Sequence, residues 1–167
     1  MPLPTMTRPP LSRTDGKSYR IRPLKRGDRD TVFRLLLSQG WEVAAADQDL
    51  AVSWVVQHPE FDTFVAHDSA SFGRIYGMLG MSHRPQLKLG GRVACIDLFT
   101  VAEEHRHQGI GTDLLGQAIR RASNLGCKRM EMSLPDERDE RHEFFEQAGF
   151  DRSSEGLYVR THLSIVR

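Results

Sequence analysis

The sequence predicts a single α/β domain in which helices flank one mixed β-sheet. The 167 residues are enough for one domain with a substantial buried core. Hydrophobic residues make up 39% of the chain and charged residues 27%, as in ordinary globular proteins. The apolar periodicity then gives the order strand, two helices, three strands, helix, strand, helix, strand. Strands interleaved with helices in this way predict a layered α/β architecture.

The N-terminal part of this domain is expected to hold one strand and two helices. Alternating apolar and polar residues predict a strand at 18–23. Asp28 can cap a first helix, which Gly40 would end. A second helix should end before Pro59, because the residue preceding a proline disfavours helical backbone. The expected caps of this second helix are Asp47 or Asp49, and its expected apolar residues are Leu50, Trp54 and Val55.

Three strands are expected in the middle of the chain. Residues 61–67 and 74–82 carry the first two, and residues 84–91 form a hairpin connection to the third. The third, at 92–101, is almost continuously apolar, which predicts a strand buried on both faces.

The helix that follows has the strongest pattern in the sequence. Its polar positions face away from one apolar stripe, and Gly126 is placed to close it as a C-cap residue. A strand is expected at 128–134, then an acidic helix that Pro135-Asp136 opens and Gly149 ends, then extended chain at 150–163. The apolar stripe consists of Leu114, Leu115, Ala118, Ile119, Ala122 and Leu125.

Composition argues against several classes of protein. The 23 basic and 22 acidic side chains nearly balance, which disfavours a nucleic-acid binder with a broad basic surface. No apolar run is long enough for a membrane-spanning helix, and residues 1–17 read as a flexible tail without the apolar core of a secretory signal. Cys95 and Cys127 are expected to be reduced thiols of a cytoplasmic protein. His105 and His107 lack the further ligands that a zinc site needs.

The turn between the apolar strand and the strong helix is a candidate anion site. A helix start offers free backbone N–H groups and the positive end of the helix dipole. Gly109 and Gly111 would let a phosphate approach the backbone, and Arg106 would add a forked cationic donor. Neither the dinucleotide fingerprint nor the P-loop pattern is present, so the motif is R-x-x-G-x-G alone. Glycines placed only for turn geometry remain the alternative.

Two blocks together resemble the GNAT N-acetyltransferase superfamily. The first is 96–101 followed by 106–111 and Leu114-Leu115, which is similar to that superfamily's acetyl-CoA motif. The second is 127–134 followed by Phe144-Phe145-Glu146 and Gly149-Phe150, which is similar to its closing strand–helix block. The resemblance covers about 92–150 and implies a mostly antiparallel sheet with splayed central strands. It also implies a soluble acetyl-CoA-dependent enzyme.

The resemblance implies a set of cofactor-binding residues. Backbone groups of Phe99 and Val101 would pair with the pantetheine arm, and an N–H of Phe99 or Thr100 would bind the thioester oxygen. Arg138 and Phe145 would face the cofactor from the last helix, while Arg141 would either meet a phosphate or stay in solvent. The loop expected to bind the pyrophosphate through its amides consists of Arg106, His107, Gln108, Gly109, Ile110, Gly111 and Thr112.

One departure from the superfamily pattern concerns proton transfer. Phe145 stands where many members have a tyrosine that protonates the leaving thiolate. Tyr158 is a candidate substitute, with a core tyrosine as the alternative. Asp97 and Glu104 are candidate bases for the amine, and Asp97 is preferred because a carboxylate in an apolar run needs a reason to be there. Asp97 as a structural carboxylate and Glu104 as a turn residue are the alternatives.

The acceptor is the least determined part. The segment 38–48, which contains Trp41 and Glu42, suits a cationic amine through cation–π and charge contacts, although Trp41 could equally pack onto the core. A small-molecule amine is the leading expectation, with no nucleic acid, no membrane and a homodimer as a further expectation. Acetylation of a protein N-terminus or lysine, and a non-catalytic acyl-CoA-binding protein, are the alternatives.

Overall fold

The computed structural model describes residues 17–71, 73–134, 136, 139–152, 157–161 and 163. Most of the predicted tail, 1–17, therefore lies outside the described residues. The strands are β1 Tyr19–Pro23, β2 Phe61–Asp68, β3 Ile75–Gln86, β4 Gly91–Val101, β5 Cys127–Ser133, β6 Asp151–Arg152 and β7 Leu157–Arg160. The helices are α1 Arg29–Ser38, α2 Ala45–Gln57, α3 Ile110–Asn124 and α4 Arg141–Gln147, with short 3₁₀ turns at Arg26–Asp28, Leu87–Leu89 and Glu103–His105.

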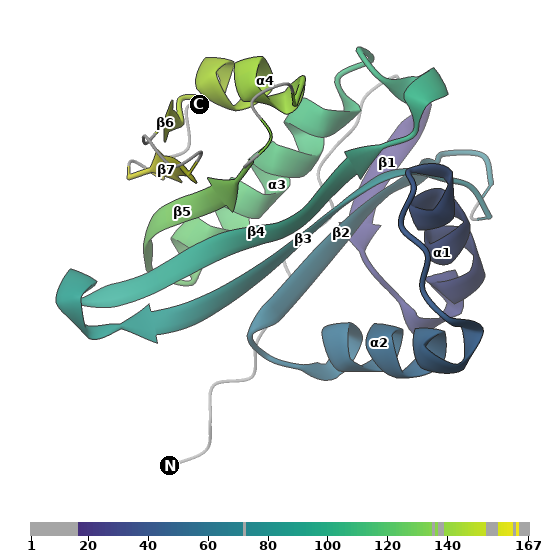
Figure 1. The fold of residues 1–167 in the computed structure, drawn as a ribbon, viewed down its shortest axis with the longest axis horizontal. Coiled ribbons are helices and arrows are strands. Elements are labelled where there is room, and N and C mark those ends of the chain that lie inside the picture. The colour runs from purple at the N-terminus through teal and green to yellow at the C-terminus, as the bar shows by residue number, and fades with distance from the viewer. Residues whose placement is uncertain are drawn as a thin grey trace.

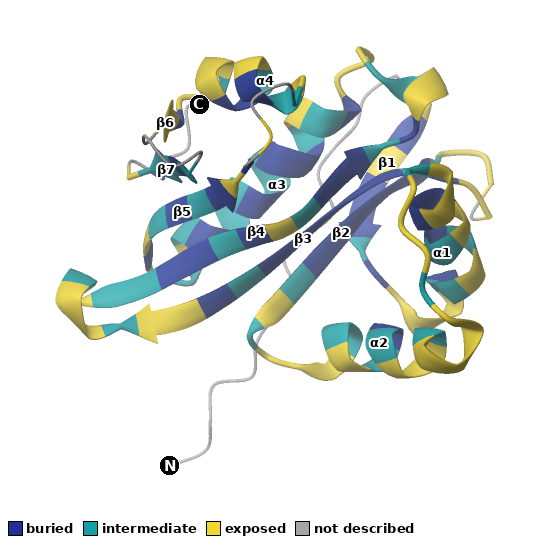
Figure 2. Cartoon of the chain, viewed as in Figure 1, coloured by how far each residue is buried: buried dark blue, intermediate teal, exposed yellow. Residues whose placement is uncertain are grey.

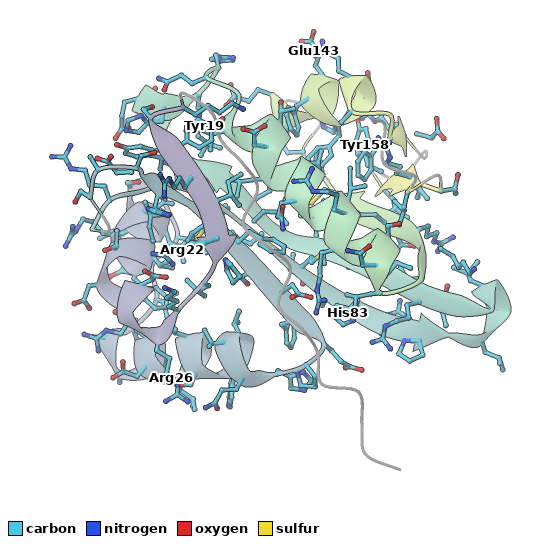
Figure 3. All side chains as sticks on the ribbon, turned by 180° about the vertical axis from the view of Figure 1, so that it is seen from behind. Tyr19, Arg22, Arg26, His83, Glu143 and Tyr158 are labelled. Atoms are coloured by element: carbon cyan, nitrogen blue, oxygen red, sulfur yellow. The ribbon has the colours of Figure 1, made fainter. Side chains whose placement is uncertain are left out.

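The seven strands form one twisted sheet in the order β1-β2-β3-β4-β5-β7-β6 (Figure 1). Every neighbouring pair is antiparallel except β4 and β5, which are parallel and joined through α3. Helices α1 and α2 lie on one face of the sheet, and α3 lies on the other (Figures 1 and 3). The predicted mixed, mostly antiparallel sheet flanked by helices is confirmed.

The α3 face of the sheet holds the larger core. The apolar stripe of α3 packs onto the strands, with Leu114, Ala118 and Ala122 fully buried. Buried positions on the central strands continue this layer (Figure 2). Gly126 has a φ of 74°, so it occupies the left-handed C-cap position expected after α3.

The α1–α2 face differs from the prediction in which side of α2 is buried. Leu50 and Trp54, expected to face the core, are 50% and 64% exposed. Val52 is buried instead, and Val55 and Val56 pack beside it. The helix also begins at Ala45, so Asp47 lies in its first turn and does not cap it. Val55 therefore packs against the core as expected, whereas Leu50 and Trp54 face solvent.

Asp28 also has a role that the sequence did not predict. It stands directly before α1, yet its carboxylate makes no cap hydrogen bond to the helix. Instead it accepts two hydrogen bonds from the buried Arg22 guanidinium, at 2.7 and 2.8 Å, and one from the Lys25 amide at 2.8 Å. Burial alone would raise the pKa of the Asp28 carboxyl, but the hydrogen bonds from Arg22 and Lys25 and the charge of Arg22 hold it below its usual value. This ion pair fixes the end of β1 to the start of α1.

Two further boundaries differ from the prediction. Strand β3 continues to Gln86, so the β3–β4 hairpin is longer than expected and projects beyond the sheet (Figure 1). Helix α4 begins at Arg141 and not at Pro135-Asp136, because two successive turns precede it. In these turns the amide of Asp139 donates to the Asp136 carbonyl and that of His142 donates to the Asp139 carbonyl, both at 3.1 Å. Pro135 lies outside the described residues. No helix in the described part of the chain combines the length and apolarity needed to span a membrane.

Candidate active site

The site is organised by the point at which β4 and β5 part. Parallel pairing between them ends at Ile96 and Met132, whereas β4 stays paired with β3 as far as Val101. Just past the parting point β4 contains a β-bulge, because Gly80 pairs with Leu98 and Met81 with Ile96, which leaves Asp97 as the extra residue. From 97 to 101 the β4 edge away from β3 consequently has no strand beside it among the described residues. The predicted splay of the central strands is confirmed.

The carbonyls on this open edge bond to arginine side chains. Arg141 Nη1 donates to the Phe99 carbonyl at 3.1 Å, and Arg106 Nε donates to the Val101 carbonyl at 3.2 Å. Residues two apart in a strand point their backbone groups to the same edge, so the N–H groups of Phe99 and Val101 also face the gap. Thr100 directs its backbone groups to β3 by the same alternation.

Helix α3 starts immediately beside this gap. Its first intrahelical bond of the i to i−4 type runs from the Asp113 amide to the Gly109 carbonyl at 3.0 Å. The amides of the preceding residues therefore have no acceptor within the helix. His107 and Gly109 have positive φ values of 59° and 86°, which turns the chain sharply into the helix. A Cβ on Gly111 would lie 3.1 Å from the Phe99 ring, so glycine also lets α3 approach β4 closely.

A cleft of about 630 Å³ opens over this junction. It is bounded by the open edge of β4, the turn into α3, the chain after α1, and the start of α4. The fifteen lining residues are Gln39, Trp41, Phe99, Thr100, Val101, His105, Arg106, His107, Gly109, Gly111, Thr112, Asp139, Glu140, Arg141 and Phe144.

Arg106 joins three walls of the cleft. Besides the Val101 carbonyl, its guanidinium contacts Glu140 at 2.7 Å and the side-chain oxygen of Gln39 at 3.0 Å. From the sequence, the guanidinium of Arg106 was expected to bind a phosphate. In the structure its Nε, Nη1 and Nη2 atoms each have a protein partner, and together they connect β4, α4 and the end of α1.

Most of the predicted cofactor residues line the cleft, and three of the described ones do not. Gln108 is exposed and donates from its side chain to the Glu104 carbonyl at 3.3 Å. Ile110 is 1% exposed, because its side chain anchors the first turn of α3 in the core. Phe145 is fully buried against Phe99 and three other aromatic rings, whereas Phe144, which was not selected, lines the cleft. Arg138 lies outside the described residues.

Two of the three predicted catalytic residues, Tyr158 and Glu104, do not line the cleft. Tyr158 is fully buried beside α4 (Figure 3), and its hydroxyl contacts His142 Nδ1 at 2.8 Å and donates to Glu146 at 3.1 Å. Burial, together with the hydrogen bond to Glu146, raises the pKa of the Tyr158 hydroxyl. Glu104 is exposed in the 3₁₀ turn after β4 and does not line the cleft.

Asp97 occupies a different position. It lies at the bulge, next to the point where β4 leaves β5, and it is exposed. Its neighbour Ser82 on β3 donates hydrogen bonds from its side chain and its backbone to the carboxylate. Burial of part of the carboxyl raises its pKa, and the bonds from Ser82 only partly offset that rise. Asp97 does not line the cleft itself, but it lies two residues before Phe99, which does.

Several cleft residues were not selected from the sequence. His105 was considered only as a metal ligand, and here its ring packs on Tyr76 with centroids 3.9 Å apart. Gln39 comes from the end of α1, and Asp139 and Glu140 come from the turn before α4. Their convergence depends on contacts between distant segments, so no local pattern marks them. Trp41 was expected on the acceptor side, and it does line the cleft at 43% exposure.

Comparisons with known proteins agree with this geometry. Residues 30–150 match the sequence model of the acetyltransferase (GNAT) family. A crystal structure of a transcriptional regulator from Bacillus halodurans C-125 has a TM-score of 0.74 at 25% identity, over 83% of this chain and 96% of that one. Two structures from Arabidopsis thaliana are also similar at lower identity, and these two show the fold alone. No curated protein sequence matches the chain.

The first Arabidopsis structure is glucosamine-6-phosphate N-acetyltransferase, with a TM-score of 0.71 at 18% identity over 83% of this chain and 95% of that one. The second is NAA60 in complex with acetyl-CoA, with a TM-score of 0.71 at 14% identity over 85% of this chain and 97% of that one.

Proposed function

The chain belongs to the acetyltransferase (GNAT) family, and from this membership we propose that it transfers an acetyl group from acetyl-CoA to a primary amine of a small molecule. The observation that carries the proposal is the junction of the open β4 edge with the start of α3. Extended backbone groups and unpaired helix amides meet there in one cleft, which suits a ligand with an amide-bearing arm and a pyrophosphate. One of the structural neighbours has been crystallised with acetyl-CoA, which is consistent with this choice of ligand.

The residues at the start of α3 fit a pyrophosphate. The amides of Ile110, Gly111 and Thr112 precede the first intrahelical acceptor, and the positive end of the helix dipole lies with them. Glycine at 109 and 111 leaves these amides unobstructed, while the buried Ile110 side chain holds the turn in place. We infer that this turn holds the pyrophosphate and that its backbone supplies most of the hydrogen bonds.

The open edge of β4 favours one of the two candidate groups for the thioester oxygen. Phe99 directs both its N–H and its carbonyl into the gap, whereas Thr100 directs its groups to β3. We therefore assign the Phe99 N–H as the donor that stabilises developing negative charge on the thioester oxygen. Loss of one such donor typically costs about 3 kcal/mol of transition-state stabilisation.

Asp97 is the best-placed base for the amine. A primary alkylammonium has a pKa of about 10.4, so it must lose a proton before it can attack. The raised pKa of the Asp97 carboxyl makes it a better proton acceptor than an ordinary aspartate, and it lies two residues before Phe99 on the strand that lines the cleft. We propose that Asp97 accepts this proton, directly or through water.

Direct attack of the amine is favoured over an acyl-cysteine route. Burial raises the pKa of the Cys95 thiol to about 11, so this thiol is not ionised at neutral pH. Burial also raises the pKa of the Cys127 thiol, and this residue belongs to the core cluster on the α3 side of the sheet. Neither cysteine lines the cleft. We therefore propose that both substrates are bound together when the acetyl group moves.

The walls near α1 support an amine acceptor. Trp41 presents a partly exposed indole to the cleft, and a cationic amine is attracted to the face of such a ring. Gln39 beside it is held by Arg106, which keeps this wall close to β4. An aromatic and amide wall of this kind suits a small, cationic acceptor.

A second function, acyl-CoA binding without turnover, is favoured by one specific observation. Phe145 has no proton to donate, and the Tyr158 hydroxyl is enclosed and already bonded to His142 and Glu146. If no other group assists the leaving thiolate, the chain would bind the thioester and fail to transfer its acetyl group.

The experiment that tests the proposal has two parts. Calorimetry on the purified chain should detect binding of coenzyme A and of acetyl-CoA, and the proposal is wrong if neither binds. Release of free thiol from acetyl-CoA should then be followed over a panel of small amines and of peptides with free N-termini or lysines. Turnover with small amines supports the proposed function, turnover only with peptides replaces the acceptor class, and binding without any turnover supports the second function.

A further inference from the structure

Neither residue considered as a general acid can give the leaving group of the proposed reaction a proton. A thiolate that departs into a partly dry cleft must be stabilised by a proton or by positive charge. Phe145 offers neither, and Tyr158 is sealed in the core. Among the described residues that line the cleft, two carry a permanent positive charge, Arg106 and Arg141.

Arg106 is poorly placed for this task because it meets β4 at Val101, two residues beyond Phe99, where the thioester oxygen is assigned. Its Nη1 and Nη2 atoms contact Glu140 and Gln39, and its Nε atom bonds the Val101 carbonyl near the end of β4. Moving its guanidinium toward a ligand would break the hydrogen bonds that connect β4, the start of α4 and the end of α1. Arg106 therefore acts in the cleft as a structural support.

Arg141 is arranged differently. It is the first residue of α4, and its Nη1 atom reaches into the gap between β4 and β5, where it lies 3.1 Å from the Phe99 carbonyl. Phe99 is the residue whose N–H is assigned to the thioester oxygen. The guanidinium thus ends beside the backbone segment along which the thioester would lie.

Asp139 fixes the direction in which this guanidinium points. Its carboxylate accepts from Arg141 Nε at 2.9 Å and from Nη2 at 2.5 Å, so both contacts lie on one edge of the fork. The hydrogen bond from Arg141 is the main cause of the lowered pKa of the Asp139 carboxyl, so the pair stays charged at neutral pH. Nη1 lies on the opposite edge, in the gap, where one of its two N–H groups donates to the Phe99 carbonyl.

We propose that Arg141 is a catalytic residue that binds the departing thiolate of coenzyme A through its Nη1 edge. The inference rests on the proposed function. In the step that it assists, the amine nitrogen forms a bond to the acetyl carbon and the carbon–sulfur bond breaks with its electron pair left on sulfur. The amine's proton passes to Asp97 or water, and the sulfur remains an anion paired with Arg141, so no proton donor at position 145 is needed.

The test measures ionisation of the product thiol on the protein, separately from turnover. Bound coenzyme A is titrated between about pH 6 and 9 while the ultraviolet absorbance of its thiolate is recorded against protein without ligand. Cys95, with a thiol pKa of about 11, contributes little in this range. A cation in contact with sulfur lowers a thiol pKa by about 1 to 3 units, and partial neutralisation by Asp139 sets the expectation at the lower end.

In the wild-type complex the thiol should titrate about one pH unit below free coenzyme A. In Arg141→Gln this difference should disappear, and kcat should fall about tenfold with little change in the KM for the amine. Arg141→Lys should give an intermediate titration, and it also decides the question if the glutamine variant does not fold. Arg120→Gln, on α3 outside the cleft, is the matched control and should behave as wild type.

Three results separate this inference from the proposed function. If wild-type protein does not bind coenzyme A, the proposed function itself fails. If it binds, and the thiol titrates identically in wild type and Arg141→Gln, Arg141 does not contact the sulfur and the inference is overturned. If Arg141→Gln weakens coenzyme A binding but leaves the thiol titration unchanged, Arg141 serves another part of the ligand and the inference is likewise overturned.

Discussion

Breaking the buried ion pair between Arg22 and Asp28 should cost far more stability than breaking the exposed Arg29–Asp30 pair next to it. We expect Asp28→Asn to lower the free energy of unfolding by about 3 kcal/mol, because it leaves the Arg22 charge buried without a counter-ion. Both side chains of the pair are less than a tenth exposed, at 8% and 9%. Asparagine keeps one acceptor oxygen for Arg22 or Lys25, which places the cost at the lower end of the range for broken buried pairs.

The matched control is Asp30→Asn. The Arg29–Asp30 pair has the same 2.7 Å separation as the Arg22–Asp28 pair, but its side chains are 38% and 71% exposed. Solvent screening should limit the cost of Asp30→Asn to at most about 1 kcal/mol. Urea unfolding followed by circular dichroism measures both variants. Equal losses in the two variants would refute the argument that burial, and not distance, determines the contribution of the pair.

The same pair predicts a pH dependence. The pKa of Asp28 is lowered on folding, so the folded state favours the ionised carboxylate. Its contribution is therefore fully present above the unfolded-state pKa of about 3.9 and is lost as the pH falls through the lower folded-state value. The stability gap between wild type and Asp28→Asn should narrow over that acidic window. A gap that stays constant down to acid unfolding would contradict the assignment.

Two further variants test the cleft. Arg106→Ala should weaken coenzyme A binding several-fold by calorimetry, because it removes the contacts that join Val101, Gln39 and Glu140; an unchanged affinity would mean that the walls hold without it. Asp97→Asn should slow turnover while leaving coenzyme A binding unchanged, and it should remove the loss of activity that wild type shows as the pH falls through the raised pKa of Asp97. A pH–rate profile that is the same in both proteins would exclude Asp97 as the base.

Patterns that are both local and repeated gave the most accurate predictions of the fold. The α3 stripe and the C-cap glycine after it were found because a helix buries every third or fourth residue and ends in a left-handed residue. The prediction of the buried side failed for α2, where Leu50 and Trp54 have the same apolar spacing but face solvent. Spacing predicts that a helix has an apolar side, but which side meets the sheet depends on how the helix docks.

Polar residues were harder to place than apolar ones. Asp28 was predicted to cap a helix, but its carboxylate instead pairs with Arg22, six residues earlier on β1. Tyr158 was a candidate acid with a core tyrosine as the alternative, and the structure buries it beside α4, where its hydroxyl contacts His142 and Glu146. A polar side chain can be satisfied by many partners, and the sequence does not say which one folding brings within reach.

The sequence by itself determined the family, the order of the elements as far as α4 and the candidate anion-binding turn. That turn is contiguous, and its properties follow from two glycines and a helix start within a few residues of one another. Only the tertiary structure decided which side chains face the cleft: Gln39, Glu140 and Arg141 reach it from segments far apart in the chain. The open edge of β4 likewise exists because pairing with β5 stops at Ile96. Neighbouring residues set backbone conformation, whereas strand pairing and packing between distant segments set the surroundings of a side chain.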